Sequence, residues 1–445
     1  MIVGIDLGTS TSEIAVLKNG VPTLVREIAG SSHGFLPSVV AIGTDGQLRV
    51  GEAATALLAV RPEASVAEVK RLMGTDQRIS LGGESFTPQE ISALILRHLK
   101  REAEAALGEP VDRAVITVPA YFTALQRRAT HDAGELAGLT VQRLINEPTA
   151  AALAYGFGQD REQMIVVFDF GGGTFDVSVL QIRGEVFEVL ASEGDFFLGG
   201  DDLDRALAEN LAAELHRVLR VDPRPHGALM MKLLMGAEAI KMHLSDNDAA
   251  EGEIEGLDLP GGKVGTLPFA LTRAQFEELI AGYVQRTMAV TRQVLIAANI
   301  DPRMISDVLC VGGSTRIPAV RNRLADVFKK QPNIGINPDE VVAQGAAIQA
   351  GSLTGALAAG TGMGARDAVA TVGHSPLLHG GARAQGPLAR PVLLDVNPST
   401  LSIQTAGGYA EHLLDKNSPI PIERTRVFTT ARDNQTRVEI DCCRG

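Results

Sequence analysis

The residues with the clearest chemical potential follow an apolar run near the middle of the chain. Residues 164–180 read MIVVFDFGGGTFDVSVL, so Asp169 ends the run, three glycines follow, and Thr174 precedes a second apolar alternation. This pattern predicts two strands joined by a glycine turn. Because glycine has no Cβ, several backbone N–H groups can converge there on one anion, with Asp169 and Thr174 beside it. The same glycines would also suit a flexible turn without a ligand, so this stretch alone leaves both interpretations open.

A second copy of the pattern stands at the front of the chain. Residues 2–17 read IVGIDLGTSTSEIAVL, with Asp6 at the end of an apolar run, then Gly8, hydroxyl residues and a returning apolar alternation. Two such hairpins indicate an internal duplication. We therefore expect the two copies to face each other across a cleft and to hold a polyphosphate between them.

Composition narrows the class of protein. The 445 residues include 45% hydrophobic and 21% charged residues, which is typical of a globular protein of roughly two to four domains. The net charge of -12 argues against sequence-independent nucleic-acid binding. The chain opens in a strand pattern without a signal peptide and has no run of membrane-spanning length, so we expect a cytoplasmic protein that does not bind membranes. Cys310 reads as buried core, and the adjacent Cys442 and Cys443 are poorly placed for a disulfide.

The elements between and after the hairpins alternate strand and helix. Helices are expected over residues 90–106, 120–138, 203–219 and 229–245, two further helical stretches over 271–298, and buried strands over 114–118 and 307–311. This alternation predicts mixed sheets with helices packed on their faces.

Three polar features of these elements have ordinary explanations. Lys70 and Arg71 are adjacent, as on a solvated helix face, and Glu147 precedes a proline, as a charge partner at a helix N-terminus does. Glu238, Lys241 and Ser245 share one helix face, as on a polar surface.

Several longer motifs nevertheless resemble one family. In order they are GIDLGTS (4–10), EVKRLMG (68–74), AVITVPAYF (114–122), INEPTAAALAYG (145–156), FDFGGGTFDVSVL (168–180), LGGDDLD (198–204), CVGGSTRIP (310–318) and NPDEVVAQGAAIQAG (337–351). The sequence resembles the ATPase domain of the heat shock protein 70 (Hsp70, DnaK-type) chaperones. Actin-like filament proteins and sugar kinases share the paired hairpins but are not expected to carry INEPTAAALAYG. The segment 75–87 is shorter than the equivalent segment expected in a family member.

The resemblance implies an α/β chain with the actin-like ATPase fold, two duplicated lobes around a nucleotide cleft. We expect this domain over 1–354, with the lobe boundary near 160–165, then a Gly/Ala-rich flexible linker over 355–391. A docking linker and a partial antiparallel β-sandwich for substrate binding are expected over 392–445. The likeness to that sandwich stops about halfway through it, so a truncated substrate-binding domain is expected.

The resemblance also implies roles for individual residues. ATP or ADP would bind with magnesium, and with potassium as a further cation, and hydrolysis would be slow. Catalysis is assigned to Lys70, Glu147, Asp176 and Thr174; magnesium to Asp6 and Asp169; the phosphates to Gly8, Thr9, Ser10, Gly171, Gly172, Gly173, Gly199, Gly200 and Asp201; and the nucleoside to Glu238, Lys241, Ser245, Gly312, Gly313, Ser314, Arg316 and Asp339.

The resemblance also implies an allosteric switch, in which the bound nucleotide controls peptide binding. Pro119, Arg127, Arg143 and Asp395 resemble the family's allosteric relay, and Ala406, Ala431, Val438 and Ile440 resemble its peptide-binding residues. The partners implied are a J-domain co-chaperone, a nucleotide exchange factor and unfolded polypeptides. The sequence thus predicts an ATP-dependent chaperone involved in protein folding and the stress response. Two alternatives remain open: a nucleotide-gated interaction module that binds no peptide, and an actin-like filament protein.

Overall fold

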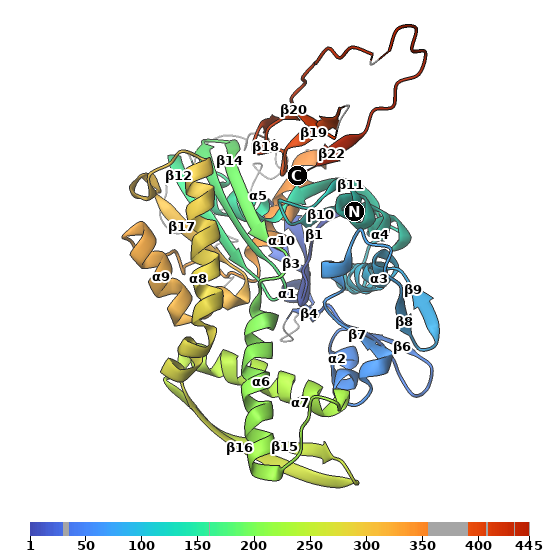
Figure 1. Ribbon diagram of the computed structural model, residues 1–445, viewed down its shortest axis with the longest axis vertical. Coiled ribbons are helices and arrows are strands. Elements are labelled where there is room, and N and C mark those ends of the chain that lie inside the picture. The colour runs from blue at the N-terminus through green and yellow to red at the C-terminus, as the bar shows by residue number, and fades with distance from the viewer. Residues whose placement is uncertain (30–34, 160, 355–389, 406–407, 431, 445) are drawn as a thin grey trace.

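Two lobes with the same sheet arrangement make up most of the protein (Figure 1). The computed structural model describes residues 1–29, 35–159, 161–354, 390–405, 408–430 and 432–444. In the first lobe β1 (Ile2–Leu7) pairs antiparallel with β2 (Thr11–Lys18) and parallel with β10 (Arg113–Val118). In the second, β12 (Glu162–Phe170) pairs antiparallel with β13 (Phe175–Arg183) and parallel with β17 (Asp307–Val311). The predicted duplication of the hairpins is therefore confirmed.

Each sheet is extended by further strands. The first sheet has the order β11–β10–β1–β2–β3, with β4 on β2, and the second the order β17–β12–β13–β14–β18–β21. The additional strands are β3 (Val21–Leu24), β4 (Leu36–Pro37), β11 (Thr140–Asn146), β14 (Val186–Asp195), β18 (Val392–Val396) and β21 (Pro419–Ile420). The centres of both sheets are fully buried, as the uncharged β-branched runs predict.

Smaller elements complete the outer part of the first lobe. They are α1 (Val25–Ile28), β5 (Val40–Ile42), β6 (Leu48–Val50), α2 (Glu52–Leu58), η1 (Pro62–Ala64), β7 (Ser65–Val66), η2 (Val69–Leu72), β8 (Ile79–Leu81) and β9 (Glu84–Phe86). In the second lobe η3 (Pro302–Met304), η4 (Gly313–Arg316) and α9 (Pro318–Phe328) flank β17.

The long helices agree with the apolar periodicity except at two places. Helix α3 (Pro88–Leu107) begins with a Thr87–Glu90 capping box and ends at left-handed Gly108. Helix α4 (Ala124–Leu136) starts four residues later than position 120, because the Thr123 side chain caps it. Residues 271–298 hold one helix, α8 (Arg273–Ala297), where two stretches were expected. Its buried residues recur at helical spacing along the whole length, so the core holds it as one rod.

Two helices lie between the lobes and are buried almost completely. Both α5 (Glu147–Gly156) and α10 (Val341–Thr354) consist mainly of small residues. A Cβ on Gly345 of α10 would lie 1.8 Å from the carbonyl oxygen of Ala150 in α5, and a Cβ on Gly4 of β1 would lie 2.1 Å from the amide nitrogen of Ala347. The interior of the molecule therefore depends on direct backbone contact.

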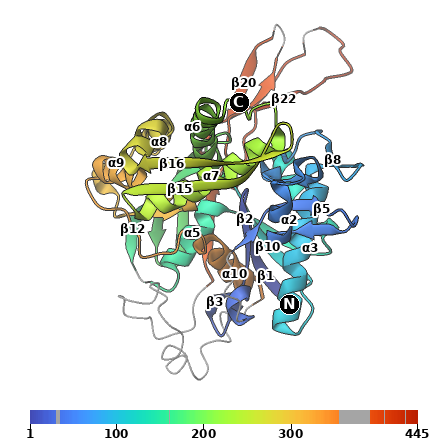
Figure 2. The same cartoon turned by 90° about the horizontal axis from the view of Figure 1, so that it is seen from below.

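Two helices and a hairpin of the second lobe form one end of the molecule. Helices α6 (Gly200–Leu219) and α7 (Gly227–Asp246) lie against the hairpin of β15 (Ala249–Leu259) and β16 (Lys263–Thr272), as the view from below shows (Figure 2). The start of α7 meets the first lobe at η1. The two lobes therefore also touch at the outer end of the cleft.

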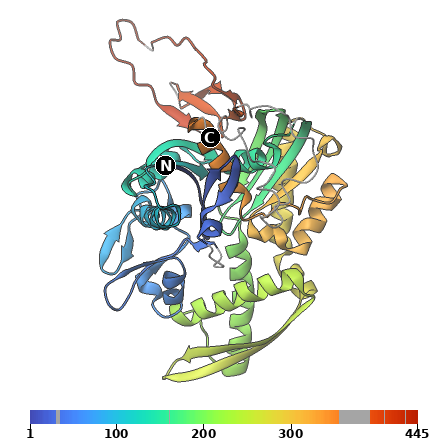
Figure 3. The ribbon, with the colours of Figure 1, turned by 180° about the vertical axis from the view of Figure 1, so that it is seen from behind.

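The C-terminal strands lie at the opposite end from that hairpin (Figure 3). Strand β18 pairs in parallel with β14 of the second lobe, and β21 pairs antiparallel with β18. A small sheet of order β20–β19–β22 follows, formed by β19 (Leu401–Gln404), β20 (Ala410–Leu414) and β22 (Cys442–Arg444). The predicted flexible linker over 355–391 lies, up to residue 389, outside the described residues.

Two sequence inferences concern single residue types. Cys310 is buried, as expected, and burial raises the pKa of its thiol to about 12. Cys310, Cys442 and Cys443 are all free thiols. In the described part of the chain, no helix combines the length and the apolarity that a bilayer crossing requires.

Replacing Gly345 with alanine tests the backbone contact between α5 and α10. Because the new methyl group would collide with the backbone at Ala150, we expect Gly345→Ala to lower the free energy of unfolding by about 1–3 kcal/mol. Urea denaturation measures this change. The control is Gly282→Ala in α8, where the position is exposed and a Cβ would meet nothing within 4 Å; it should leave stability unchanged or slightly higher. Equal stability of the Gly345→Ala variant and the wild type would contradict the tight crossing.

Candidate functional site

The turns of the two duplicated hairpins touch each other. A Cβ on Gly172 would lie 1.9 Å from Oγ of Ser10, and a Cβ on Gly173 would lie 2.2 Å from Cγ2 of Thr9. The glycines of one turn thus make room for the hydroxyl residues of the other. Gly199, at the start of α6, is equally close, since its Cβ would lie 2.0 Å from the Gly172 carbonyl oxygen. These three glycines are required by the close approach of backbone from different elements.

Three aspartates of the two hairpins share one buried region. Asp169 and Asp176 are directly opposite each other across β12 and β13, so their side chains stand on the same face. Asp6 accepts a hydrogen bond of 2.6 Å from the Thr117 hydroxyl. Burial raises the pKa of all three carboxyls, and the nearby Glu147 carboxylate raises those of Asp169 and Asp176 further. Both carboxylate oxygens of Asp176 are buried with no hydrogen-bond partner among the described residues.

Lys70 is the cation that faces these carboxylates. It lies in the short 3₁₀ helix η2, is 5% exposed, and its Nζ is 2.5 Å from Oε1 of Glu147. Burial opposes the charge on Lys70, but attraction to Glu147 and Asp6 outweighs it and raises the pKa of the ammonium group. The interpretation of Lys70 as part of a solvated helix face is therefore wrong. Glu147 is the first residue of α5, as predicted, but it is buried in an ion pair.

A pocket between the lobes contains many of the residues singled out in the sequence. Its lining includes Asp6, Gly8, Thr9, Ser10, Lys70, Glu147, Asp169, Gly171, Gly172, Thr174, Gly312, Gly313 and Asp339. At one end Arg316 donates a hydrogen bond of 2.6 Å to Asp339, and Ser314 donates one of 3.1 Å to the Gly171 carbonyl. The pocket thus draws on both hairpins, η2, α5 and the loop after β17.

The three polar residues of α7 that were expected to contact the nucleoside differ in their contacts and exposure. Lys241 forms an ion pair of 2.6 Å with Asp204 of α6 and lies near the Gly200 carbonyl, whereas Glu238 is exposed. The Ser245 hydroxyl donates to the Lys241 backbone carbonyl within the same helix. Of the three predicted nucleoside contacts on α7, Lys241 is thus the one that the structure joins to the edge of the pocket.

Two acidic residues at the start of α6 complete this edge. The Ser10 hydroxyl donates to Asp201 over 3.3 Å, and burial raises the pKa of Asp201 to about 6. Burial raises the pKa of Asp204 to about 7, although its partner Lys241 opposes the shift. Sequence reasoning did not single out Asp204, because its only local signal was its position in the LGGDDLD motif.

Hydrogen bonds join Asn146, the residue next to Glu147 of the pocket, to strand β18. Asn146, which directly precedes Glu147, donates to the Asp395 carboxylate over 2.5 Å and accepts from Arg127 over 2.6 Å. Arg127 also donates to the Ala120 carbonyl, one residue after Pro119. Burial raises the pKa of Asp395, while Arg127 and the more exposed Arg143 lower it. Asn146 is the link that sequence reasoning missed, although it lies inside the INEPTAAALAYG motif.

Further contacts join the C-terminal segment to β14. Lys416 forms an ion pair of 2.7 Å with Glu193, and the Ser192 amide donates to the Asn417 side chain over 3.2 Å. The structure gives less support to the expected peptide-binding residues. Ala406 and Ala431 lie outside the described residues, whereas Val438 and Ile440 are 61% and 65% exposed in a segment without helix or strand.

The site suits a nucleotide with a divalent cation. Burial raises the pKa values of Asp6, Asp169 and Asp176, and repulsion from neighbouring carboxylates raises those of Asp169 and Asp176 further, so a bound cation would stabilise the charged forms. Oxygen donors such as those of Asp6 and Asp169 are the ligands that Mg²⁺ takes beside phosphates. The glycine turns offer backbone N–H groups for the phosphates at the same place.

Two duplicated lobes that enclose a glycine-lined, carboxylate-rich pocket define the actin-like nucleotide-binding fold. A family model described as Hsp70 protein matches residues 2–367 and 378–445. The chain therefore belongs to the Hsp70 family of ATP-binding chaperones, which generally work with J-domain co-chaperones and nucleotide exchange factors.

Removing the Asp395 carboxylate tests the link between the pocket and β18. Because Asp395→Ala loses the hydrogen bond from Asn146 and the attraction of Arg127, we expect the amides of residues 392–396 to exchange hydrogen about tenfold faster. Hydrogen exchange measured by mass spectrometry reports this change. Glu423→Ala, at an exposed position of the same segment, is the matched control. Unchanged protection of β18 would show that its pairing with β14 and β21 holds it without the Asp395 contacts.

Proposed function

We propose that this protein is a slow ATPase that controls a C-terminal polypeptide-binding segment, as a chaperone of the Hsp70 type. The observation that carries the proposal is the continuity between Glu147 in the pocket and its neighbour Asn146, which bonds Asp395 of β18. A change at the phosphate end of the pocket would thus reach β18 through adjacent residues of one short segment.

The contacts of the side chains support the catalytic roles that we propose. Hydrolysis joins a water oxygen to the γ-phosphorus and breaks its bond to the bridging oxygen, and it needs charge neutralisation and an aligned water. Lys70, which lines the pocket, would neutralise charge on the γ-phosphate. Asp176 and Glu147, whose pKa values are raised by burial, are suited to hold the water and accept its proton.

Magnesium fits the same arrangement. Asp6 and Asp169 would hold it, mostly through water, because Mg²⁺ dehydrates reluctantly. When bound, it would neutralise part of the phosphate charge. Thr9, Ser10 and the 171–174 turn would then hold the phosphate oxygens, and Arg316 and Asp339 would border the nucleoside.

A second candidate function is a nucleotide-gated interaction module that binds no peptide client. The exposure of Val438 and Ile440, outside any strand, favours it. The two functions are separated by the ATPase rate in the presence of an extended apolar peptide. A chaperone should hydrolyse ATP faster when the peptide is added, whereas a rate that stays flat at saturating peptide would support the module instead.

Lys70 provides the test of catalysis. Lys70→Ala should retain nucleotide binding but lower the single-turnover rate of ATP hydrolysis by about 100-fold or more, because a preorganised charge next to the γ-phosphate is lost. Fluorescence titration with a labelled nucleotide measures binding, and phosphate release measures turnover. Lys263→Ala, at an exposed position of β16, is the control. Hydrolysis at the wild-type rate would remove Lys70 from the mechanism.

A further inference from the structure

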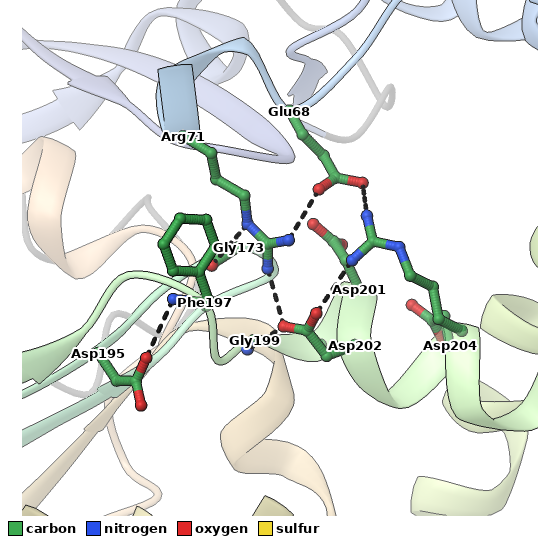
Figure 4. A network of polar contacts seen from close by, with 12 residues as sticks. Glu68, Arg71, Gly173, Asp195, Phe197, Gly199, Asp201, Asp202 and Asp204 are labelled. Carbon is green, nitrogen blue, oxygen red and sulfur yellow. Dashed lines mark hydrogen bonds and ion pairs between the residues drawn. The ribbon is translucent and has the colours of Figure 1, made fainter. Parts of the chain in front are cut away.

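A network of charged side chains joins the two lobes beside the nucleotide pocket (Figure 4). Glu68 and Arg71 belong to the first lobe, at the start and in the middle of η2, whereas Asp202 and Arg205 belong to α6 of the second. Arg71 lies 2.8 Å from Asp202, and Arg205 lies 2.5 Å from Glu68. Two ion pairs therefore cross from lobe to lobe in opposite senses, with the cation on a different side each time.

Pairs within each lobe hold the crossing pairs in register. Glu68 also contacts Arg71 over 3.1 Å, and Asp202 also contacts Arg205 over 3.0 Å. The four side chains thus form a closed ring of alternating charge. Such a network is worth more than isolated surface pairs, because each side chain is held by two partners.

Arg71 also contacts the glycine turn of residues 171–174, which we call the phosphate turn. Its Nε donates a hydrogen bond of 2.8 Å to the Gly173 carbonyl, while its Nη2 donates to Asp202. The same Asp202 oxygen accepts the Gly199 amide over 2.8 Å. One guanidinium group from the first lobe therefore contacts both the glycine turn and, through Asp202, the start of α6. A planar fork of donors is suited to this double role, and a lysine is not.

The backbone of the first lobe is shaped for these contacts. Glu68 has a φ of 55°, in the left-handed region that non-glycine residues seldom adopt. The left-handed turn occurs immediately before the one-turn helix that presents Lys70 to Glu147 and Arg71 to Asp202. Unusual backbone conformations of this kind persist where the surrounding contacts fix them.

We propose that the ring of Glu68, Arg71, Asp202 and Arg205 is an interlobe latch that slows nucleotide release, with Arg71 as a positioning residue for the phosphate turn. The inference rests on the proposed nucleotide function of the adjacent pocket. Because Lys70 and Arg71 are neighbours in one turn of the first lobe, separating the lobes at the latch also draws Lys70 away from the 171–174 turn of the second lobe. Release of nucleotide and loss of the catalytic geometry are thereby coupled.

The rate at which a fluorescent ADP analogue dissociates from the full chain tests the latch. Arg205 is 44% exposed, so Arg205→Gln should fold normally while removing one crossing pair. We expect it to release ADP about two- to fivefold faster at low salt, with the difference fading at high salt. Arg217→Gln is the matched control, because Arg217 pairs with Glu214 on the same helix without crossing between lobes; it should release ADP at the wild-type rate.

A second variant addresses the positioning role of Arg71. Arg71→Lys keeps the charge but cannot hold both Gly173 and Asp202, so we expect release about tenfold faster or more. The double variant Arg205→Gln with Glu68→Gln should release ADP no faster than Glu68→Gln alone, since Glu68→Gln already removes the pair by which Arg205 crosses between the lobes.

The outcomes separate the latch from the function on which it rests. Wild-type release rates in both Arg205→Gln and Arg71→Lys would overturn the latch while leaving nucleotide binding intact. A wild-type chain that binds no labelled nucleotide would overturn the proposed function and the latch with it. A lowered melting temperature with unchanged release would assign the ring a purely structural role and so also overturn the latch.

Discussion

The close approach of the two hairpin turns is the constraint on which the rest of the structure depends. Gly172 and Gly173 have no side chain, so Ser10 and Thr9 of the other hairpin occupy the space that a Cβ would fill. This contact brings carboxylates from both sheets into one buried region. Like charges cannot be gathered there without counter-charges, and Lys70 supplies one from the protein. The remaining negative charge suits the pocket to a cation, and the backbone N–H groups of the glycine turns suit it to phosphates.

The short helix η2 determines how the cleft and the lobes are connected. A 3₁₀ turn places successive side chains about a third of a turn apart, so neighbours point in different directions. Lys70 accordingly reaches Glu147 in the pocket while Arg71 reaches Asp202 on the second lobe. The chemical group and the interlobe contact thus move as one body.

The first turn of α5 connects the pocket to the C-terminal segment. Glu147 faces Lys70, and Asn146 bonds both Arg127 and Asp395. The strands around these residues are buried and close-packed, which supports the proposed transmission of small shifts to β18. Strand β18 is meanwhile attached to the second lobe by its pairing with β14. The C-terminal segment therefore contacts both lobes.

The sequence by itself determined the duplicated hairpins, most helices and the motifs of the family, because these depend on local periodicity and on glycine at fixed positions. It predicted one helix wrongly as two, since the core that holds α8 straight is not visible locally. Only the tertiary structure decided that Lys70 is buried, that Arg71 crosses between lobes and that Asn146 bonds Asp395. Each of these contacts joins residues far apart in the chain, or turns neighbouring side chains in different directions, and no spacing along the sequence encodes such distances.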